Sequence, residues 1–362
     1  MLTNRASYPI EAVILKHEPD DVLLATVVLS VREAGEVAFY LFRNEERIHI
    51  KWYSPDTTLR FIVKARSGFY RVLAFFRSPD GTIINKYSNP VFLYPVVYAL
   101  EQTFKKPQSQ ERVLVLSGSH WKFPALYYAG HEQQPLFVIL SGRVDRAKHS
   151  LPSFSRWAWA EQRMFPGHVL CVADPTLELH EGLELGWYLG TAEHDASEEL
   201  ADLLRRFAER LGIPEGKIIF WGSSGGGFSA LALASRMENT TAVAINAQTN
   251  ILVYDVAQAT ENIRRHCFGG KSIREIQSRF GPRVNVIQAW NNNRRSRAIL
   301  LQNTCDTHHY AHHFKPFWEV HGGASEEGAA ANGRHFAWIY SDTRGHVRES
   351  EQMIPGILNL IS

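Results

Sequence analysis

One serine in the sequence lies between two glycines at the spacing that a nucleophilic serine requires. Gly222 and Gly226 flank Ser224 in the pattern G-x-S-x-G. The apolar run 217–221 precedes this motif, and the Ala- and Leu-rich segment 229–237 follows it. A serine on a tight turn between a strand and a helix needs small neighbours, because larger side chains two residues away would collide with nearby backbone. The motif therefore predicts a nucleophile elbow with Ser224 at its tip.

Other glycine-rich motifs fit this segment less well. A Rossmann G-x-G-x-x-G pattern fails from Gly222, because Ser224 occupies the place of the second glycine. Counted from Gly225, the looser form that ends in Ala230 fits, but it begins some way past the strand. A phosphate-binding P-loop fails because no Gly-Lys-Ser/Thr follows. A turn without chemistry and Ser223 as the nucleophile stay as alternatives, although only Ser224 has glycines at both offsets.

The elements around the motif alternate between apolar runs and helical patterns. Runs typical of buried strands lie at 113–116, 136–140, 169–173, 218–221, 242–245, 298–301 and 336–340. Between 196 and 211, four leucines and a phenylalanine recur on one face of a helix. Alternating strands and helices imply a mostly parallel sheet. Residues 113–362 are therefore expected to form one α/β domain that carries Ser224.

From Leu136 to the C-terminus the chain resembles the α/β-hydrolase superfamily. The resemblance is carried by the Ser224 motif and by the order of the elements, with Ser141-Gly142-Arg143 in the position of the oxyanion loop. Two further segments, Asp174-Pro175-Thr176-Leu177 and 185–190, are similar to bacterial proteins of capsular-polysaccharide synthesis and accessory secretion. Some of those proteins handle carbohydrate O-acyl groups. The resemblance implies a serine hydrolase or acyltransferase that needs no cofactor.

In that fold the nucleophile, the acid and the histidine follow one another along the chain. Gly345-His346 follows the last apolar run, so His346 is the expected general base, with a surface loop histidine as the alternative. Asp306 follows the run 298–303 and is the expected acid, whose carboxylate would hold the imidazole in one tautomer. Asp342, which is close to His346 in the sequence, and Glu319 are the alternatives for the acid.

The resemblance also implies an oxyanion hole beside Ser224. Its donors would be the backbone N–H of Gly225 and a backbone N–H of Gly142 or Arg143, which are placed to stabilise the charge of a tetrahedral intermediate. The side chain of Arg143 would either bind an acidic group of the substrate or face solvent.

The segment 247–296 separates two predicted strands, and in this fold such an insertion commonly caps the active site. It contains Trp290, Arg294 and the three asparagines 291–293. An aromatic ring with amide and guanidinium groups suits stacking on, and hydrogen bonding to, a sugar or an anionic substrate. Trp290 and Arg294 are therefore candidate substrate-binding residues. The alternative is an ordinary solvated excursion.

Four histidines follow Asp306 closely. His308 and His312 lie four residues apart, as do His309 and His313, so each pair would share a helix face at a spacing known for metal ligands. The sequence shows no third ligand at a suitable spacing and no His-Glu-x-x-His motif. No metal or other cofactor is therefore expected. Instead, a helix after the acid would turn one pair, with His308, toward the substrate pocket.

The first 102 residues have a different pattern. Short apolar or alternating runs typical of strands lie at 10–15, 22–31, 36–42, 48–53, 59–64, 70–76, 82–87 and 91–94. Ser78-Pro79-Asp80-Gly81 is a strong hairpin turn, because proline presets φ and glycine accepts a positive φ. This series of short strands predicts an antiparallel, immunoglobulin-like β-sandwich over 1–102. The polar segment 103–112 is the predicted linker.

Charge and cysteine content argue against several other classes of protein. Lys plus Arg number 39 and Asp plus Glu number 37, for a net charge of +2, which argues against a nucleic-acid-binding surface. No apolar run approaches the roughly 18 residues that a membrane span needs, and no apolar signal core follows the N-terminus. Three scattered cysteines do not form a disulfide framework, so a reducing, cytoplasmic location is expected.

Together these features predict a serine esterase or acyltransferase that works through an acyl-enzyme on Ser224. The expected substrate is a small-molecule or carbohydrate ester with a short O-acyl group. One alternative is a non-catalytic assembly or secretion partner that keeps the fold, and another is a peptidase of the same fold. The sequence does not indicate an oligomeric state.

Overall fold

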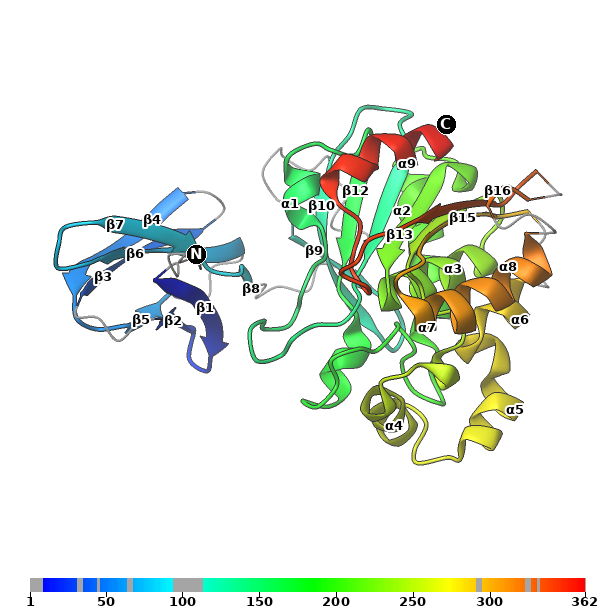
Figure 1. Ribbon diagram of the computed structural model, residues 1–362, viewed down its shortest axis with the longest axis horizontal. Coiled ribbons are helices and arrows are strands. Elements are labelled where there is room, and N and C mark those ends of the chain that lie inside the picture. The colour runs from blue at the N-terminus through cyan, green and yellow to red at the C-terminus, as the bar shows by residue number, and fades with distance from the viewer. Residues whose placement is uncertain are drawn as a thin grey trace, which may run out of the picture. The chain divides into compact units, whose positions relative to one another are not determined.

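The structure divides into two compact units (Figure 1). The computed structural model describes residues 9–30, 35–43, 46–63, 68–93, 113–290, 295–322, 327–330 and 333–361. The first unit comprises Met1–Val97 with Asp145–Ser153, and the second comprises Tyr98–Val144 with Phe154–Ser362. The predicted linker, 103–112, lies outside the described residues.

Two antiparallel sheets build the first unit. One has the strand order β1-β2-β5, from β1 (Ile10–Glu18), β2 (Val22–Leu29) and β5 (Thr58–Ile62). The other has the order β4-β3-β6-β7, with β8 paired to β6, from β3 (Glu36–Arg43), β4 (Glu46–Ser54), β6 (Gly68–Arg77), β7 (Ile83–Tyr87) and β8 (Val91–Leu93). Alternate residues of both sheets, such as Val13 and Phe39, enter one shared core. The two sheets agree with the predicted sandwich, while its immunoglobulin-like topology stays a prediction.

The predicted hairpin turn joins β6 and β7. The backbone N–H of Gly81 donates to the carbonyl of Ser78 over 2.9 Å, and Gly81 has a φ of 85°. A positive φ of this size favours glycine, which is why the Pro-Asp-Gly sequence was informative at this position.

A nine-stranded sheet forms the centre of the second unit, in the order β16-β17-β15-β14-β13-β11-β12-β10-β9. Its strands are β9 (Val113–Ser117), β10 (Lys122–Tyr128), β11 (Leu136–Leu140), β12 (His168–Val172), β13 (Ile218–Ser223), β14 (Thr241–Ile245), β15 (Arg297–Asn303), β16 (Gly328–Ala329) and β17 (Phe336–Tyr340). Six neighbouring strands are parallel, namely β12, β11, β13, β14, β15 and β17. Strands β9, β10 and β16 pair antiparallel at the edges. All seven predicted strands are present, and β10 and β16 are additional.

Helices connect these strands. They are α1 (Trp157–Glu161), α2 (Ala196–Arg210), α3 (Gly225–Arg236), α4 (Ala257–His266), α5 (Ile273–Val284), α6 (Val286–Trp290), α7 (Thr307–His309), α8 (Lys315–His321) and α9 (Ile354–Ile361). A π-helical turn, Tyr310–Phe314, lies between α7 and α8. Among the described residues, none of the helices has both the length and the apolar character needed to cross a membrane.

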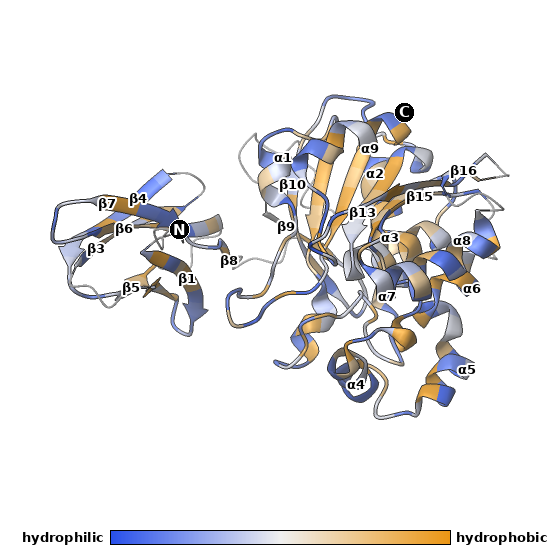
Figure 2. Cartoon of the chain, viewed as in Figure 1, coloured by the Kyte–Doolittle hydropathy of each residue, from blue (hydrophilic) through white to orange (hydrophobic). Residues whose placement is uncertain are grey.

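Side chains on both faces of the sheet are buried, because successive residues of a strand point to opposite sides. Leu136 and Val138 of β11 share a core with the apolar faces of α2 and α3. Phe137, between them, contacts Phe165 on the other face, and Phe165 contacts Trp221 of β13, each at 5.3 Å between ring centroids. The central strands are accordingly hydrophobic along their length (Figure 2). This burial makes the sheet a rigid platform for the loops at its carboxyl edge.

A buried ion pair ties the C-terminal segment to the sheet. The Arg156 guanidinium donates to both oxygens of Glu349, over 2.6 and 2.5 Å, and the two side chains are 3% and 0% exposed. Trp221 of β13 donates to the same carboxylate over 2.6 Å, and Arg156 also donates to the Ser223 hydroxyl over 2.9 Å. Burial raises the pKa of Glu349, but the charge and hydrogen bonds of Arg156 outweigh it and hold that pKa below its ordinary value.

Removing one partner of this ion pair should lower the free energy of unfolding. Arg156→Met leaves the Glu349 carboxylate buried without its cation, so we expect a loss of about 3–5 kcal/mol in the free energy of unfolding. Urea unfolding monitored by circular dichroism measures it. Replacing both residues with methionine should recover most of the loss, because an apolar pair of similar size is often neutral.

The matched control is Glu238→Gln, which removes one partner of an exposed ion pair with Arg295, 66% and 65% exposed. It should change the free energy of unfolding by no more than about 1 kcal/mol. Equal losses for Arg156→Met and Glu238→Gln would contradict a structural role for the buried pair.

Candidate active site

Ser224 occupies a strained turn between β13 and α3. Its φ of 54° and ψ of −122° are unusual for a residue with a side chain. Its backbone N–H donates to the carbonyl of Ile245 over 2.9 Å. A Cβ on Gly222 would lie 2.2 Å from the carbonyl carbon of Gly226, and a Cβ on Gly226 would lie 2.6 Å from the carbonyl oxygen of Leu140. Only glycine fits at either position, so the motif reflects the close approach of three backbone segments.

Hydrogen bonds connect the three residues that the sequence marked as nucleophile, base and acid. The Ser224 Oγ lies 2.9 Å from His346 Nε2, and His346 Nδ1 lies 2.5 Å from Asp306 Oδ2. Asp306 follows β15 and His346 follows β17, so both come from carboxyl ends of parallel strands, at the edge where β13 ends in the elbow. The Asp306 side chain is 6% exposed and that of His346 is 37% exposed. The acid is thus enclosed, while the base is open to a substrate.

Two buried asparagines hold the loop that carries His346. Asn246 follows β14 and Asn303 ends β15, and both are 0% exposed. Asn246 Nδ2 donates to the Val347 carbonyl and Asn303 Nδ2 donates to the Gly345 carbonyl, each over 2.7 Å. The backbone on both sides of His346 is therefore fixed to the ends of two strands. Neither asparagine was among the candidate residues from the sequence. The sequence signal that could have identified them is an asparagine shortly after each of the apolar runs 242–245 and 298–301.

The alternative acids are engaged elsewhere or exposed. The Asp342 carboxylate pairs with the Arg344 guanidinium over 2.6 Å, and hydrogen bonds from Arg344 lower the pKa of Asp342 to about 2. Glu319 is exposed on α8. The geometry therefore favours Asp306 as the partner of His346.

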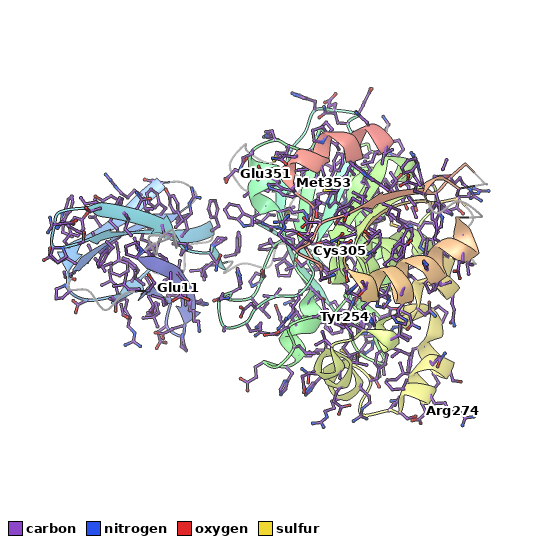
Figure 3. The ribbon with its side chains drawn as sticks, viewed as in Figure 1. Glu11, Tyr254, Arg274, Cys305, Glu351 and Met353 are labelled. Carbon is purple, nitrogen blue, oxygen red and sulfur yellow. The ribbon has the colours of Figure 1, made fainter. Side chains whose placement is uncertain are left out.

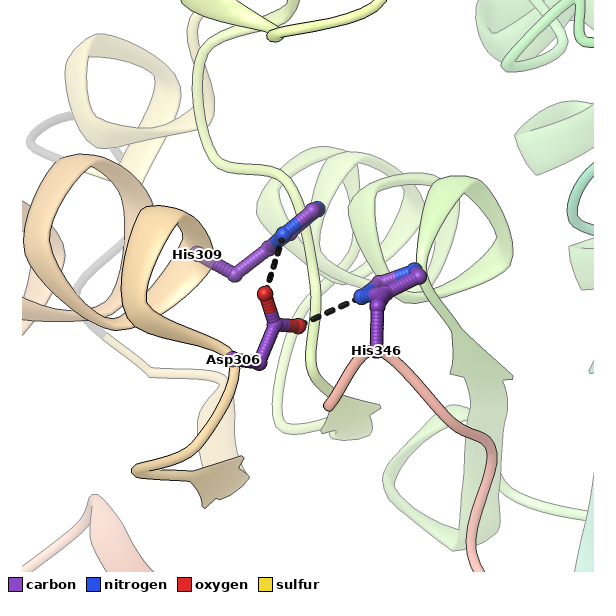
Figure 4. A group of neighbouring side chains, drawn as sticks. All are labelled: Asp306, His309 and His346. Carbon is purple, nitrogen blue, oxygen red and sulfur yellow. Dashed lines mark hydrogen bonds and ion pairs between the residues drawn. The ribbon is translucent and has the colours of Figure 1, made fainter. Parts of the chain in front are cut away.

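A second set of contacts joins Asp306 to Ser224 by another route. His309 Nδ1 lies 3.0 Å from Asp306 Oδ1, so the carboxylate lies between two imidazoles (Figure 4). Gln248 Nε2 lies 2.7 Å from His309 Nε2 and 3.0 Å from Ser224 Oγ. Gln248 is 0% exposed and His309 is 3% exposed. Gln248 was not among the candidates from the sequence, and His309 was considered there only as one of four clustered histidines.

The protonation of this cluster follows from burial and hydrogen bonding. Burial raises the pKa of Asp306, but the hydrogen bonds from His309 and His346 outweigh it, so the pKa lies well below its ordinary value. Burial lowers the pKa of His309, and its hydrogen bond to Asp306 offsets only part of that effect. The cluster therefore contains an ionised carboxylate beside a neutral buried imidazole.

Asp306, His309 and His346 also offer three possible metal ligands within 4.8 Å of one another. The two imidazole nitrogens lie 3.0 and 2.5 Å from the carboxylate oxygens. Zinc binds nitrogen and oxygen ligands at about 2.0–2.2 Å, which keeps neighbouring ligand atoms more than roughly 3 Å apart. The observed distances are those of direct hydrogen bonds. In the two histidine pairs noted in the sequence, the ring centroids of His308 and His312 lie 4.7 Å apart, and those of His309 and His313 lie 5.1 Å apart.

The predicted oxyanion loop lies against the start of α3. A Cβ on Gly142 would lie 3.1 Å from the Ser223 carbonyl oxygen, 3.6 Å from the Gly226 nitrogen and 3.8 Å from the Gly225 nitrogen. The N–H groups of Gly227 and Phe228 in the first turn of α3 donate to the Ser224 carbonyl, over 3.0 and 3.1 Å. The Gly225 N–H precedes them at the N-terminus of the helix, where N–H groups can bind a ligand beside Ser224. The structure therefore places Gly142 and Gly225 next to one another at the elbow.

A cavity of about 340 Å³ lies close to these residues, with Arg143, Leu185, Tyr254 and Asn262 among those that line it. Leu185 packs directly on Gly225, since a Cβ there would lie 2.3 Å from Leu185 Cδ1. Tyr254, labelled in Figure 3, has its ring centroid 5.9 Å from that of His309. The cavity is thus bounded by side chains that contact the elbow and the histidine cluster.

Arg143 lines this cavity, whereas His308 is not among its lining residues. The Arg143 guanidinium donates to Glu184 over 2.7 Å and is 62% exposed. His308, which is half-buried, lies with Nε2 3.2 Å from the carbonyl of Val253, next to Tyr254. Both residues stay candidates for contact with a substrate.

The predicted substrate-binding role of Trp290 is wrong. Trp290 is 2% exposed, and its indole N–H donates to the carbonyl of Leu231 over 3.1 Å. Its ring contacts His335, whose Nδ1 accepts from the backbone N–H of Ala298 at the start of β15. Trp290 is therefore a core residue at the amino edge of the sheet, opposite the edge that carries Ser224. Arg294 and the asparagines 291–293 lie outside the described residues.

Comparison with known proteins gives likenesses in structure but not in sequence. No family model matches the chain, and no curated protein matches its sequence. A chain of the Glycosylation Associate Protein (Gap123) complex from Streptococcus agalactiae matches with a TM-score of 0.52 and 11% identity, over 99% of this chain and 71% of that chain.

Two enzymes provide further matches. The capsule O-acetyltransferase of Neisseria meningitidis serogroup A, in complex with CoA, has a TM-score of 0.50 and 14% identity, over 69% of this chain and 95% of that chain. Prolyl oligopeptidase B from Galerina marginata has a TM-score of 0.53 and 10% identity, over 98% of this chain and 50% of that chain. At these identities the likeness concerns the fold alone. The chain has the α/β-hydrolase fold, and its structural neighbours include a capsule O-acetyltransferase.

Proposed function

We propose that the protein is a serine esterase or O-acyltransferase that forms an acyl-enzyme on Ser224. The observation that carries this proposal is the continuous line of hydrogen bonds from the Ser224 hydroxyl through His346 to Asp306, of 2.9 and 2.5 Å. A serine on a strained turn, an accessible imidazole and a buried carboxylate are the groups that nucleophilic acyl transfer requires.

The geometry supports the following sequence of steps. His346 Nε2 removes the Ser224 hydroxyl proton as Oγ attacks the carbonyl carbon of an ester. The Gly225 N–H and a backbone N–H of Gly142 or Arg143 bind the oxyanion. His346 then passes its proton to the leaving alcohol, which leaves the acyl group on Oγ. Water or a sugar hydroxyl attacks this ester in the second half-reaction, with His346 again as the base. Asp306 stabilises the imidazolium that forms in each half.

A short acyl group on a carbohydrate is the substrate that we propose. Leu185 packs on Gly225, and the Trp187 indole nitrogen lies 3.3 Å from where a Cβ of Gly225 would be, so bulky side chains crowd the acyl position. The neighbouring cavity offers an aromatic ring, an amide and a guanidinium from Tyr254, Asn262 and Arg143. Such groups suit the faces and hydroxyls of sugars. The fold shared with a capsule O-acetyltransferase supports the same class of reaction.

Ser224→Ala should abolish ester hydrolysis and labelling by a fluorophosphonate, with the fold unchanged. Loss of the nucleophile removes several orders of magnitude in rate. Ser223→Ala is the matched control, because the Ser223 hydroxyl binds Arg156 rather than a reacting group, and this variant should keep labelling. Gel-based labelling and mass spectrometry of the modified peptide measure both variants. Labelling of Ser224→Ala but not Ser223→Ala would reject Ser224 as the nucleophile.

Asp306→Asn should lower kcat by about three to four orders of magnitude, since the amide cannot hold His346 in the required tautomer or stabilise its positive charge. Asp342→Asn, which alters a carboxylate paired with Arg344, should stay within a few-fold of the wild type. Steady-state hydrolysis of p-nitrophenyl acetate compares the two. Equal losses of kcat in Asp306→Asn and Asp342→Asn would argue that Asp306 has only a structural role.

Short esters should be preferred to long ones. We expect kcat/KM to be highest for an acetylated oligosaccharide, lower for p-nitrophenyl acetate and far lower for p-nitrophenyl palmitate, because the acyl position is crowded. Leu185→Ala should raise kcat/KM for butyryl and hexanoyl esters relative to the acetyl ester. A preference for palmitate would favour a lipase, and cleavage of short peptides without ester hydrolysis would favour a peptidase.

A further inference from the structure

We infer that Gln248 is a further catalytic residue, which donates to Ser224 Oγ, and that His309 is the residue that positions it from Asp306. This inference rests on the proposed function, because it assigns a role at the same oxygen. The contacts form a closed circuit: Ser224, His346, Asp306, His309, Gln248 and again Ser224, through contacts of 2.9, 2.5, 3.0, 2.7 and 3.0 Å.

The orientation of the Gln248 amide follows from its neighbours. The Trp187 indole nitrogen lies 3.2 Å from Gln248 Oε1, and an indole N–H is only a donor. The oxygen of the amide must therefore face Trp187. The amide nitrogen then faces Ser224 Oγ and His309 Nε2, and its two N–H groups match these two acceptors. Trp187 and Gln248 are both 0% exposed, so water does not compete for the amide.

With the amide in this orientation, each member of the circuit carries its hydrogen at a defined atom. His309 Nε2 accepts from Gln248, so its Nδ1 carries the hydrogen and donates to Asp306 Oδ1. Ser224 Oγ accepts from Gln248, which leaves the hydroxyl hydrogen for His346 Nε2. His346 Nδ1 then donates to Asp306 Oδ2. Each donor in the circuit has one acceptor, so all five hydrogen bonds can form at the same time.

This arrangement has a consequence for each half-reaction. Before acylation, the Gln248 donor turns the Ser224 hydrogen toward the base. In deacylation, water attacks the acyl carbon and loses a proton to His346, the bond from carbon to Oγ breaks, and its electron pair goes to Oγ. The Gln248 N–H, 3.0 Å away, stabilises the charge that develops on Oγ until His346 returns the proton. The His309 ring, stacked on His346 at 4.1 Å, keeps the amide in place.

The test is a double-mutant cycle with Gln248→Met and His309→Phe. The first removes the donor at nearly constant volume, and the second keeps a ring against His346 but removes both hydrogen bonds. Burst kinetics with p-nitrophenyl acetate give the acylation and deacylation rates separately. We expect Gln248→Met to lower both rates about 10- to 100-fold, with KM within about threefold, because one donor at the reacting oxygen is lost. His309→Phe should lower them about tenfold.

The combined variant decides between coupled and independent roles. If His309 acts through Gln248, the combined loss should be much smaller than the product of the two single losses. The control Gln277→Met makes the same change on the exposed side of α5 and should leave both rates unchanged. A Gln248→Met enzyme within twofold of the wild type, or single losses that multiply, would overturn the inference.

A second measurement separates this inference from the proposed function and does not depend on the variants folding. Nitrogen-15 NMR of the histidine rings in the wild-type protein at pH 8 should show His309 as the neutral Nδ1–H tautomer. An Nε2–H tautomer would overturn the circuit whatever the activity. Absence of fluorophosphonate labelling of the wild type would instead reject the proposed function, while the tautomer would still report on the circuit.

Discussion

A single buried carboxylate organises the candidate site. Asp306 accepts an Nδ1–H group on each of its oxygens, from His309 and His346, and this pairing keeps it ionised in a place where water has little access. Each imidazole then presents Nε2 as an acceptor. One faces the Ser224 hydroxyl and the other faces the Gln248 amide. The direction of the hydrogen bonds among these side chains follows from that one ionised group.

The loops that bear these side chains are held mainly by hydrogen bonds to buried polar side chains. The sheet supplies rigidity through apolar contacts, but such contacts are not directional. Asn246 and Asn303 bind carbonyl groups on either side of His346, and Glu349 binds Arg156 and Trp221 just beyond it. Hydrogen bonds define angle as well as distance, so they fix the imidazole where packing alone would leave freedom. Their burial explains why they persist beside a solvent-accessible base.

Features of the fold and site with a local cause were predictable from the sequence. The Ser224 elbow needs glycines at fixed offsets, and the strands have a clear apolar pattern. Strand β10 was missed because it contains Pro124, which lacks a backbone N–H. Trp290 was misassigned because an indole suits a core as well as a sugar. Gln248 had no local signal, since its contact with His309 joins residues 61 positions apart and exists only in the folded chain.

The ion pair between Arg156 and Glu349 has a consequence for how the protein reaches activity. It joins residues 193 positions apart, so it forms only when distant parts of the second unit have come together. His346 lies only three residues before Glu349, so the segment that this ion pair holds also carries the base of Ser224. The position of the base therefore depends on a contact between residues that are distant in the sequence, and not on the elbow alone.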